Sequence, residues 1–160
     1  MNRKILNLLE KNARLTNADL ATITGLDEKT VEGEIKQMEE SGVIRGYKGI
    51  VDWESAEPES VSAIIELKVT PTEGVGFERV AERIAKYSEV ESVYLTSGAC
   101  DLIVSVRGKS FHEVCTFLEK EIAVIDSVTS TATKFIMRKY KELGCELTGD
   151  STDERGVLSL

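Results

Sequence analysis

Apolar residues recur every three or four positions in three short segments near the start of the chain. This spacing predicts helices over residues 3–11, about 17–24 and 28–40, each with one buried face. The apolar positions that share a face within each segment are Ile5, Leu8 and Leu9, then Leu20 and Ile23, then Val31, Ile35 and Met38. Residues 1–52 are therefore expected to form a small domain of three helices.

The second and third predicted helices are separated by a spacing typical of a helix-turn-helix. Thr16 and Asp19 resemble a capping box that opens the second helix, and Asp27 can cap the third. The small Ala21 lets the two helices approach, and Gly25 permits the positive φ that ends the second helix. A helix supported in this way can enter a DNA major groove.

Gly42 closes the third helix, and residues 43–52 are expected to form an extended segment with a turn, as in a winged-type helix-turn-helix. Residues 53–60 are acidic and contain Pro58, which predicts a linker.

After the linker, segments with the apolar spacing of strands are interspersed with segments that have the apolar spacing of helices. The predicted order is strand, helix, strand, strand, helix, strand, followed by residues 144–160, which lack periodicity and are expected to be a flexible tail. The predicted elements lie at about 61–69, 77–87, 90–96, 101–106, 111–122 and 128–137. This order predicts an α+β, ferredoxin-like βαββαβ domain over residues 61–143.

The two helices of such a domain cover only one face of its sheet. Ile64, Ile103, Phe135 and Met137 are expected on the other face, where they would form an exposed apolar patch. We therefore expect dimerisation through the sheet, giving a homodimer or a higher homo-oligomer.

Charge and composition narrow the class of protein. The net charge of −8 is concentrated in residues 53–60 and 144–160, so both predicted domains are close to neutral and DNA binding stays open. No apolar run is long enough to span a membrane, and the N-terminus is not a signal peptide. Three widely spaced cysteines indicate reduced thiols in a cytoplasmic protein, and a single histidine makes a metal site implausible. No cofactor is expected.

Short segments in both predicted domains together match the pattern of a known family. They are Ile5-Leu6, Asn12-Ala13-Arg14, Ala18-Asp19-Leu20-Ala21, Gly25-Leu26, Gly42-Val43-Ile44, Gly46-Tyr47 and Gly98-Ala99-Cys100-Asp101. With these segments the chain resembles, over roughly residues 2–143, the Lrp/AsnC (feast/famine) family of bacterial and archaeal transcription regulators.

The resemblance implies that the N-terminal domain reads DNA and that the C-terminal domain binds an amino acid or a related metabolite. Family effector sites lie between subunits near the G-x-x-D turn, which corresponds here to Gly98, Ala99, Cys100 and Asp101. Backbone N–H groups of such a turn can meet a carboxylate, and an acidic side chain can meet an ammonium group. The alternative is that Gly98 only makes a hairpin and Asp101 only bonds to its own turn.

The predicted reading helix departs from the family pattern because residues 28–40 carry two lysines against five glutamates. Since cations supply most non-specific affinity for DNA, we expect weak, salt-dependent binding per half-site. The candidate DNA contacts are Lys29, Thr30, Gly33 and Lys36 on the helix and Arg14 and Arg45 beside it, with Arg3, Lys4 and Lys48 as further phosphate contacts. For each charged residue, an ordinary solvated side chain is the alternative.

The sequence therefore favours a DNA-binding transcription regulator that responds to an amino acid, and not an enzyme. One alternative is a metabolite-sensing interaction protein that has lost DNA binding. Another is an enzyme similar to the sirohaem decarboxylases, which share this architecture and would use His112 and Arg107.

Overall fold

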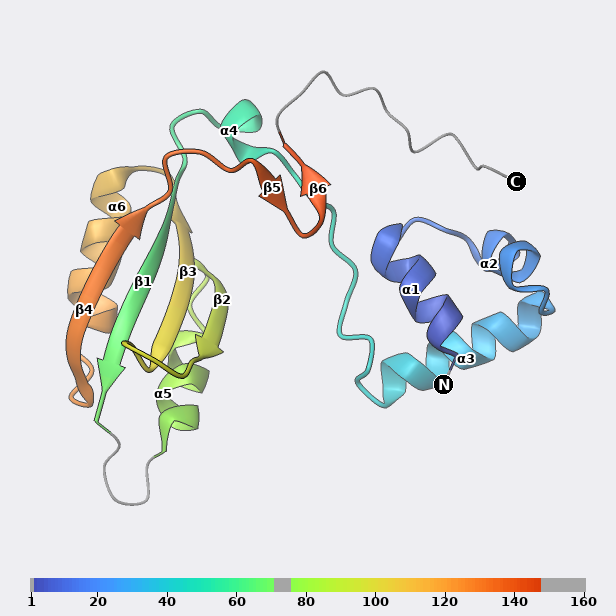
Figure 1. The fold of residues 1–160 in the computed structure, drawn as a ribbon, viewed down its shortest axis with the longest axis horizontal. Coiled ribbons are helices and arrows are strands. Elements are labelled where there is room, and N and C mark those ends of the chain that lie inside the picture. The colour runs from blue at the N-terminus through green and yellow to red at the C-terminus, as the bar shows by residue number, and fades with distance from the viewer. Residues whose placement is uncertain (1, 71–75, 148–160) are drawn as a thin grey trace. The chain divides into compact units, whose positions relative to one another are not determined.

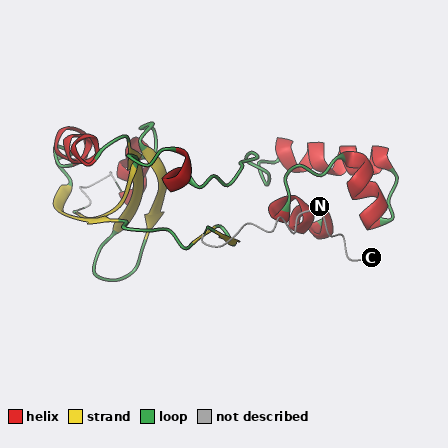
Figure 2. Cartoon of the chain, turned by 90° about the horizontal axis from the view of Figure 1, so that it is seen from above, coloured by secondary structure: helices red, strands yellow, loops and turns green. Residues whose placement is uncertain are grey.

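The computed structural model describes residues 2–70 and 76–147 and divides the chain into two units between Ile50 and Val51 (Figure 1). The first unit contains three helices. The second contains a four-stranded sheet with two helices packed on one face (Figures 1 and 2).

The three predicted helices of the first unit are confirmed as α1 (Arg3–Lys11), α2 (Asn17–Thr24) and α3 (Glu28–Glu40). Their ends follow from local chemistry. The predicted capping box is present, since the Thr16 hydroxyl accepts from the Asp19 N–H at 3.1 Å and the Asp19 carboxylate accepts from the Thr16 N–H at 2.9 Å. At the other end of α2, Gly25 has a φ of 76° and donates its N–H to the Ala21 carbonyl.

The helices of the first unit share a small core. Among the described residues, its buried members are Ile5, Leu9, Leu20, Val31 and Met38. Each comes from one of the predicted stripes, so the period of 3.6 residues identified the buried faces correctly.

Residues 43–52 form no hydrogen-bonded strand in the described chain. The side chains of Val43, Tyr47 and Ile50 are exposed there, whereas Ile44 packs against the core of the first unit. An isolated pair of strands is marginal in water without a larger packed face. The predicted linker also contains a short helix, α4 (Trp53–Ala56), which Asp52 caps by accepting from the Ser55 N–H and hydroxyl.

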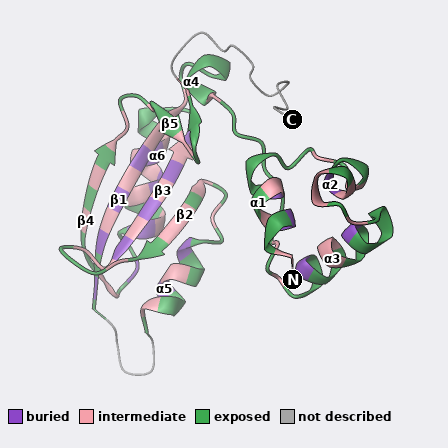
Figure 3. Ribbon diagram, turned by 45° about the vertical axis from the view of Figure 1, so that its right-hand side comes forward, coloured by how far each residue is buried: buried purple, intermediate pink, exposed green. Residues whose placement is uncertain are grey.

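The βαββαβ order of the second unit is confirmed. Its elements are β1 (Val61–Val69), α5 (Phe77–Ile84), β2 (Val90–Leu95), β3 (Leu102–Gly108), α6 (Phe111–Phe117) with a π-helical turn η1 (Leu118–Ile122), and β4 (Val128–Phe135). The strands lie in the order β2-β3-β1-β4 and all pairs are antiparallel. Alternate residues of β1 and β3 are buried under the helices, as Figure 3 shows.

The helix-free face of the sheet is more polar than predicted. Phe135 lies opposite Ala63 on the helix face, where its ring stacks on Phe111 with centroids 4.1 Å apart. Met137 lies beyond the end of β4 and is 93% exposed. The prediction that these two residues share the open face is wrong, because alternating threonines along β4 do not reveal which face is buried.

One further correction concerns the predicted C-terminal tail. Residues 144–147, assigned to the flexible tail, take part in a short hairpin of β5 (Lys141–Glu142) and β6 (Cys145–Glu146). The remainder of the predicted tail, residues 148–160, lies outside the described residues. Within the described chain, no helix has the length and apolar character needed to cross a membrane.

Candidate nucleic-acid interface and effector site

The outer side of α3 is fully available in the first unit. Val31 and Met38 are 0% and 1% exposed and face the core, whereas Lys29, Gly33 and Lys36 are exposed on the opposite side of the helix. A Cβ atom built on Gly33 would meet no atom within 4 Å. The structure therefore brings three of the predicted DNA contacts onto one surface stripe.

Two of the candidate residues on α3 already have local partners. The Thr30 hydroxyl donates to Asp27 Oδ2 at 2.5 Å, and the Thr30 N–H donates to Oδ1 at 2.9 Å. These bonds hold the pKa of the Asp27 carboxyl below its usual range. Lys36 Nζ lies 3.9 Å from Glu40 Oε1, and both side chains are more than two-thirds exposed, so this ion pair is weak and easily exchanged.

The candidates outside α3 lie on other segments of the first unit. Arg14 is exposed in the loop between α1 and α2, and Arg45 is exposed after the end of α3. The Arg45 guanidinium lies beside Gly42, where an added Cβ would come within 2.9 Å of its central carbon. Lys4 is committed elsewhere, because its Nζ donates to the Ile23 carbonyl at 2.8 Å and so closes the end of α2.

Helical geometry adds Gln37, which the sequence analysis did not name. It is exposed and lies one turn after Gly33 on α3. Its place four residues after the glycine is visible in the sequence, but an amide side chain carries no charge and so does not by itself indicate a phosphate contact.

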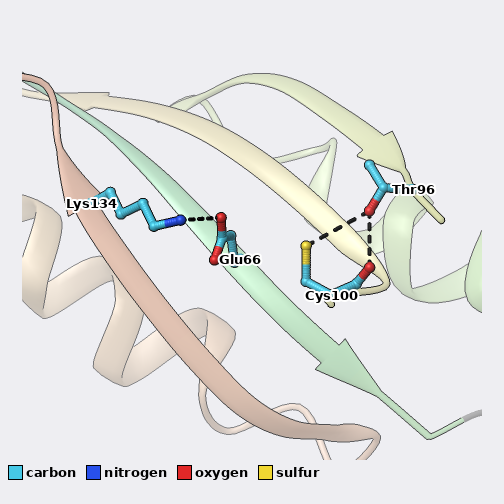
Figure 4. Close-up of polar contacts among 4 residues, drawn as sticks. All are labelled: Glu66, Thr96, Cys100 and Lys134. Carbon is cyan, nitrogen blue, oxygen red and sulfur yellow. Dashed lines mark hydrogen bonds and ion pairs between the residues drawn. The ribbon is translucent and has the colours of Figure 1, made fainter. Parts of the chain in front are cut away.

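The candidate effector residues form the turn between β2 and β3. Gly98 has a φ of 140°, a conformation that side chains rarely adopt, and Ala99 is exposed. The Thr96 hydroxyl donates to the Cys100 carbonyl at 3.0 Å and lies 3.7 Å from the Cys100 thiol (Figure 4). Within the described chain, the N–H groups of Gly98 and Ala99 donate to no acceptor, so they are open to a ligand.

Asp101 ties this turn to the neighbouring strand. Its carboxylate accepts from the Val69 N–H at 2.8 Å, and its own N–H donates to the Leu67 carbonyl at 2.9 Å. The residue therefore completes the end of β1 and does more than bond to its own turn. One carboxylate oxygen, Oδ2, is used in this way.

The residues suggested for the enzyme alternative do not form a shared site. Arg107 lies over the Trp53 ring at 4.1 Å and pairs with Glu91 at 2.8 Å. His112 is exposed at the start of α6 and lines an open cavity of about 520 Å³ with Lys109 and Lys120. Among the described residues, no group of histidine, cysteine and acidic side chains could hold a metal ion.

Two family models match the chain. The Lrp/AsnC ligand binding domain matches residues 62–144, and a winged helix-turn-helix DNA-binding domain matches residues 1–45. Each match falls within one of the two units.

Curated relatives and solved structures agree with these matches. The chain is 41% identical over 157 residues to the uncharacterized HTH-type transcriptional regulator YugG of Bacillus subtilis, covering 98% of this chain and 95% of that protein. It is 35% identical to the HTH-type transcriptional regulator FL11 of Pyrococcus abyssi, covering 89% and 91%. The fold matches the crystal structure of the leucine response regulatory protein LrpA of Mycobacterium tuberculosis with a TM-score of 0.75 and 23% identity, covering 91% and 97%.

Proposed function

The chain belongs to the Lrp/AsnC family of transcriptional regulators, and from this premise we propose that it binds duplex DNA through α3 and an amino acid through the β2–β3 turn. DNA is contacted by Lys29, Thr30, Gly33 and Lys36, with Arg14 and Arg45 on phosphates from the flanks. The effector is held by Gly98, Ala99, Cys100 and Asp101.

The exposed outer side of α3 is the observation that carries the DNA assignment. A reading helix must present side chains to base edges while its apolar side stays in the core. In α3, Val31 and Met38 anchor the helix, and Lys29, Gly33 and Lys36 stay open to solvent. Two lysines per subunit provide few phosphate contacts, so paired half-sites are needed for useful affinity.

Fluorescence anisotropy with the duplex upstream of the protein's own gene tests the assignment. We expect binding that weakens steeply from about 50 to 200 mM salt. The variants K29Q and K36Q should each reduce the slope of log affinity against log salt by about 1 for each phosphate contact that is lost. Absence of binding at low salt, with and without amino acids, would instead favour a sensor that has lost DNA.

The open N–H groups of the β2–β3 turn support the effector assignment. Gly98 and Ala99 offer donors for a carboxylate, and the acidic Asp101 lies next to them for an ammonium group. An α-amino acid carries both groups at the required short separation.

A thermal-shift screen of the twenty amino acids, followed by calorimetry, tests this site. The variant A99D places a carboxylate at the exposed turn and should abolish binding by repelling the ligand carboxylate, while A99S keeps a small neutral side chain and should bind normally. Equal amino-acid affinities for the two variants would move the effector site elsewhere.

The open sheet face supports self-association. Ile64 and Ile103 are half-buried there and Tyr94, which pairs with Ile103, is exposed. The Glu66–Lys134 ion pair of Figure 4 lies on the same face and makes it amphipathic. We infer a homodimer packed through this face, which sedimentation at micromolar concentration would confirm and which the variant I103E should dissociate.

A further inference from the structure

The net charge of α3 hides an uneven distribution around Gly33. On a helix, the neighbours of a residue lie three and four positions away. For Gly33 these neighbours are Lys29, Thr30, Lys36 and Gln37. All four are exposed, and none is acidic. The surface immediately around the glycine is therefore positive although the helix as a whole is negative.

We propose that Gly33 is the point of closest approach between α3 and DNA, and that Gln37 reads an adenine in each half-site. This inference rests on the proposed DNA binding and deepens it. The Gly33 patch is defined here as Gly33 with Lys29, Thr30, Lys36 and Gln37.

The missing side chain makes room at the centre of the patch. Nothing lies within 4 Å of the position that a Gly33 Cβ would take, so the helix backbone itself forms the outer surface. A base edge can then approach more closely than it could at any other residue of α3. Lys29 and Lys36 precede and follow Gly33 along the same stripe of the helix and are placed to reach phosphates.

Gln37 has the chemistry for direct readout. Its amide offers a donor and an acceptor, which match N7 and N6 of adenine in a bidentate pair. Thr30 is less suited to hydrogen-bonded readout because its hydroxyl donates to Asp27. The Gln37 side chain is exposed and is the neutral amide of the patch, so we assign the adenine contact to it.

The glutamates of α3 do not occupy the patch. Glu39 accepts a hydrogen bond from the Tyr47 hydroxyl at 2.8 Å, away from the outer stripe. At 100° per residue, Glu28 and Glu32 lie on the same flank of the helix as Glu39, and Glu34 lies on the opposite flank, where it is half-buried. Glu40 shares the outer stripe, but it is the last residue of α3 and its carboxylate pairs with Lys36.

The variant G33A distinguishes an effect on DNA binding from an effect on folding, because it should weaken binding while it stabilises the first unit. A helix interior is more stable with alanine than with glycine, so the thermal unfolding midpoint of the first unit should rise by a few degrees. The added methyl group should lower affinity for the upstream duplex by roughly 5- to 150-fold, the range of overpacking a fitted contact. The control N7A, at an exposed position of α1, should raise the midpoint without changing affinity.

Selection from a randomised duplex library, followed by anisotropy on single-base variants, tests the readout. Wild type should prefer an A·T pair at one position of each half-site by roughly 5- to 150-fold, and Q37A should lose that preference. E40Q is the matched control: removal of its charge should raise affinity for all sequences equally and leave the preference intact.

The outcomes distinguish the two proposals. If wild type binds no duplex in low salt, the proposed function fails. If wild type binds but G33A binds equally well, or Q37A keeps every base preference, DNA binding stands and the Gly33 patch is overturned.

Discussion

The two units differ in how much core supports their exposed surfaces. Among the described residues, the first unit buries five apolar side chains, whereas the second buries thirteen under its two helices. In the first unit the candidate site is one side of a helix whose other side makes up much of that small core. In the second unit the candidate site is a turn at the edge of the sheet, next to a deep core. DNA reading should therefore be more sensitive to core damage than effector binding.

The sharpest test compares one substitution in the two cores. Leu20 and Leu67 are both fully buried, so L20A and L67A should each cost about 2–5 kcal/mol. The first unit has less stability to lose, so L20A should unfold it and abolish DNA binding while amino-acid binding survives. L67A should lower the midpoint of the second unit without unfolding it.

Two probes follow the units separately in this test. The single tryptophan, Trp53, lies in the second unit, whereas circular dichroism at 222 nm reports the helices of both units. A partial loss of ellipticity with unchanged Trp53 fluorescence therefore marks the unfolding of the first unit alone. If L20A shifted both signals together, the units would unfold as one and the comparison would be wrong.

The turn of the helix-turn-helix provides the next largest effect. Gly25 has a φ of 76° and open space around the position of a side chain. The variant G25A therefore makes no steric clash, and its cost comes only from the left-handed backbone conformation. We expect a loss of about 1–2 kcal/mol in the first unit. The same substitution at Gly33, where the backbone is helical, should stabilise by about 0.5–1 kcal/mol. Equal effects at both glycines would contradict the assigned conformations.

Local signals in the sequence identified most elements of both units. Thr16, Asp19 and Gly25 marked the ends of α2 by hydrogen bonds between near neighbours. The alternation along β1 marked a strand because its burial also alternates. Both signals are read within about ten residues, which is the range over which a sequence carries its own structural context.

Features that depend on residues far apart in the sequence were harder to predict. Phe135 was placed on the wrong face, since its burial depends on pairing with Ala63 and stacking on Phe111. Asp101 was predicted as an effector residue, and its hydrogen bond to Val69, 32 residues away in the sequence, was not predicted. The two lysines of the Gly33 patch are visible in the sequence, but the negative net charge of the whole helix obscured their position.

A smaller effect is expected within the second unit, where the linker helix α4 contacts β3. The Arg107 guanidinium lies 4.1 Å from the centre of the Trp53 ring, and its Nε pairs with Glu91. R107K keeps the charge and loses the flat stacking surface, so the second unit should lose about 0.5–1 kcal/mol. Trp53 fluorescence should shift as its ring is uncovered, and R79K, at an exposed position of α5, should change neither signal.

The smallest predicted effect is the loss of stability at acid pH, which should depend on different carboxylates in the two units. In the first unit, hydrogen bonds from Thr16 and Thr30 lower the pKa of Asp19 and Asp27 from 3.8, and in the second unit Ser55 does the same for Asp52. A carboxyl whose pKa is lower in the folded state stabilises the fold above its ordinary pKa. That contribution is lost as pH falls below 3.8 and through the folded value. Asparagine does not titrate, caps α3 at position 27 about as well as aspartate, and at position 19 still offers an oxygen to the Thr16 N–H. The variant D19N/D27N should therefore flatten the acid loss of stability in the first unit. D52N should leave that loss unchanged and act on the second unit alone. Unfolding midpoints measured from pH 5 downward test this, and an unchanged acid loss in D19N/D27N would show that other carboxylates control it.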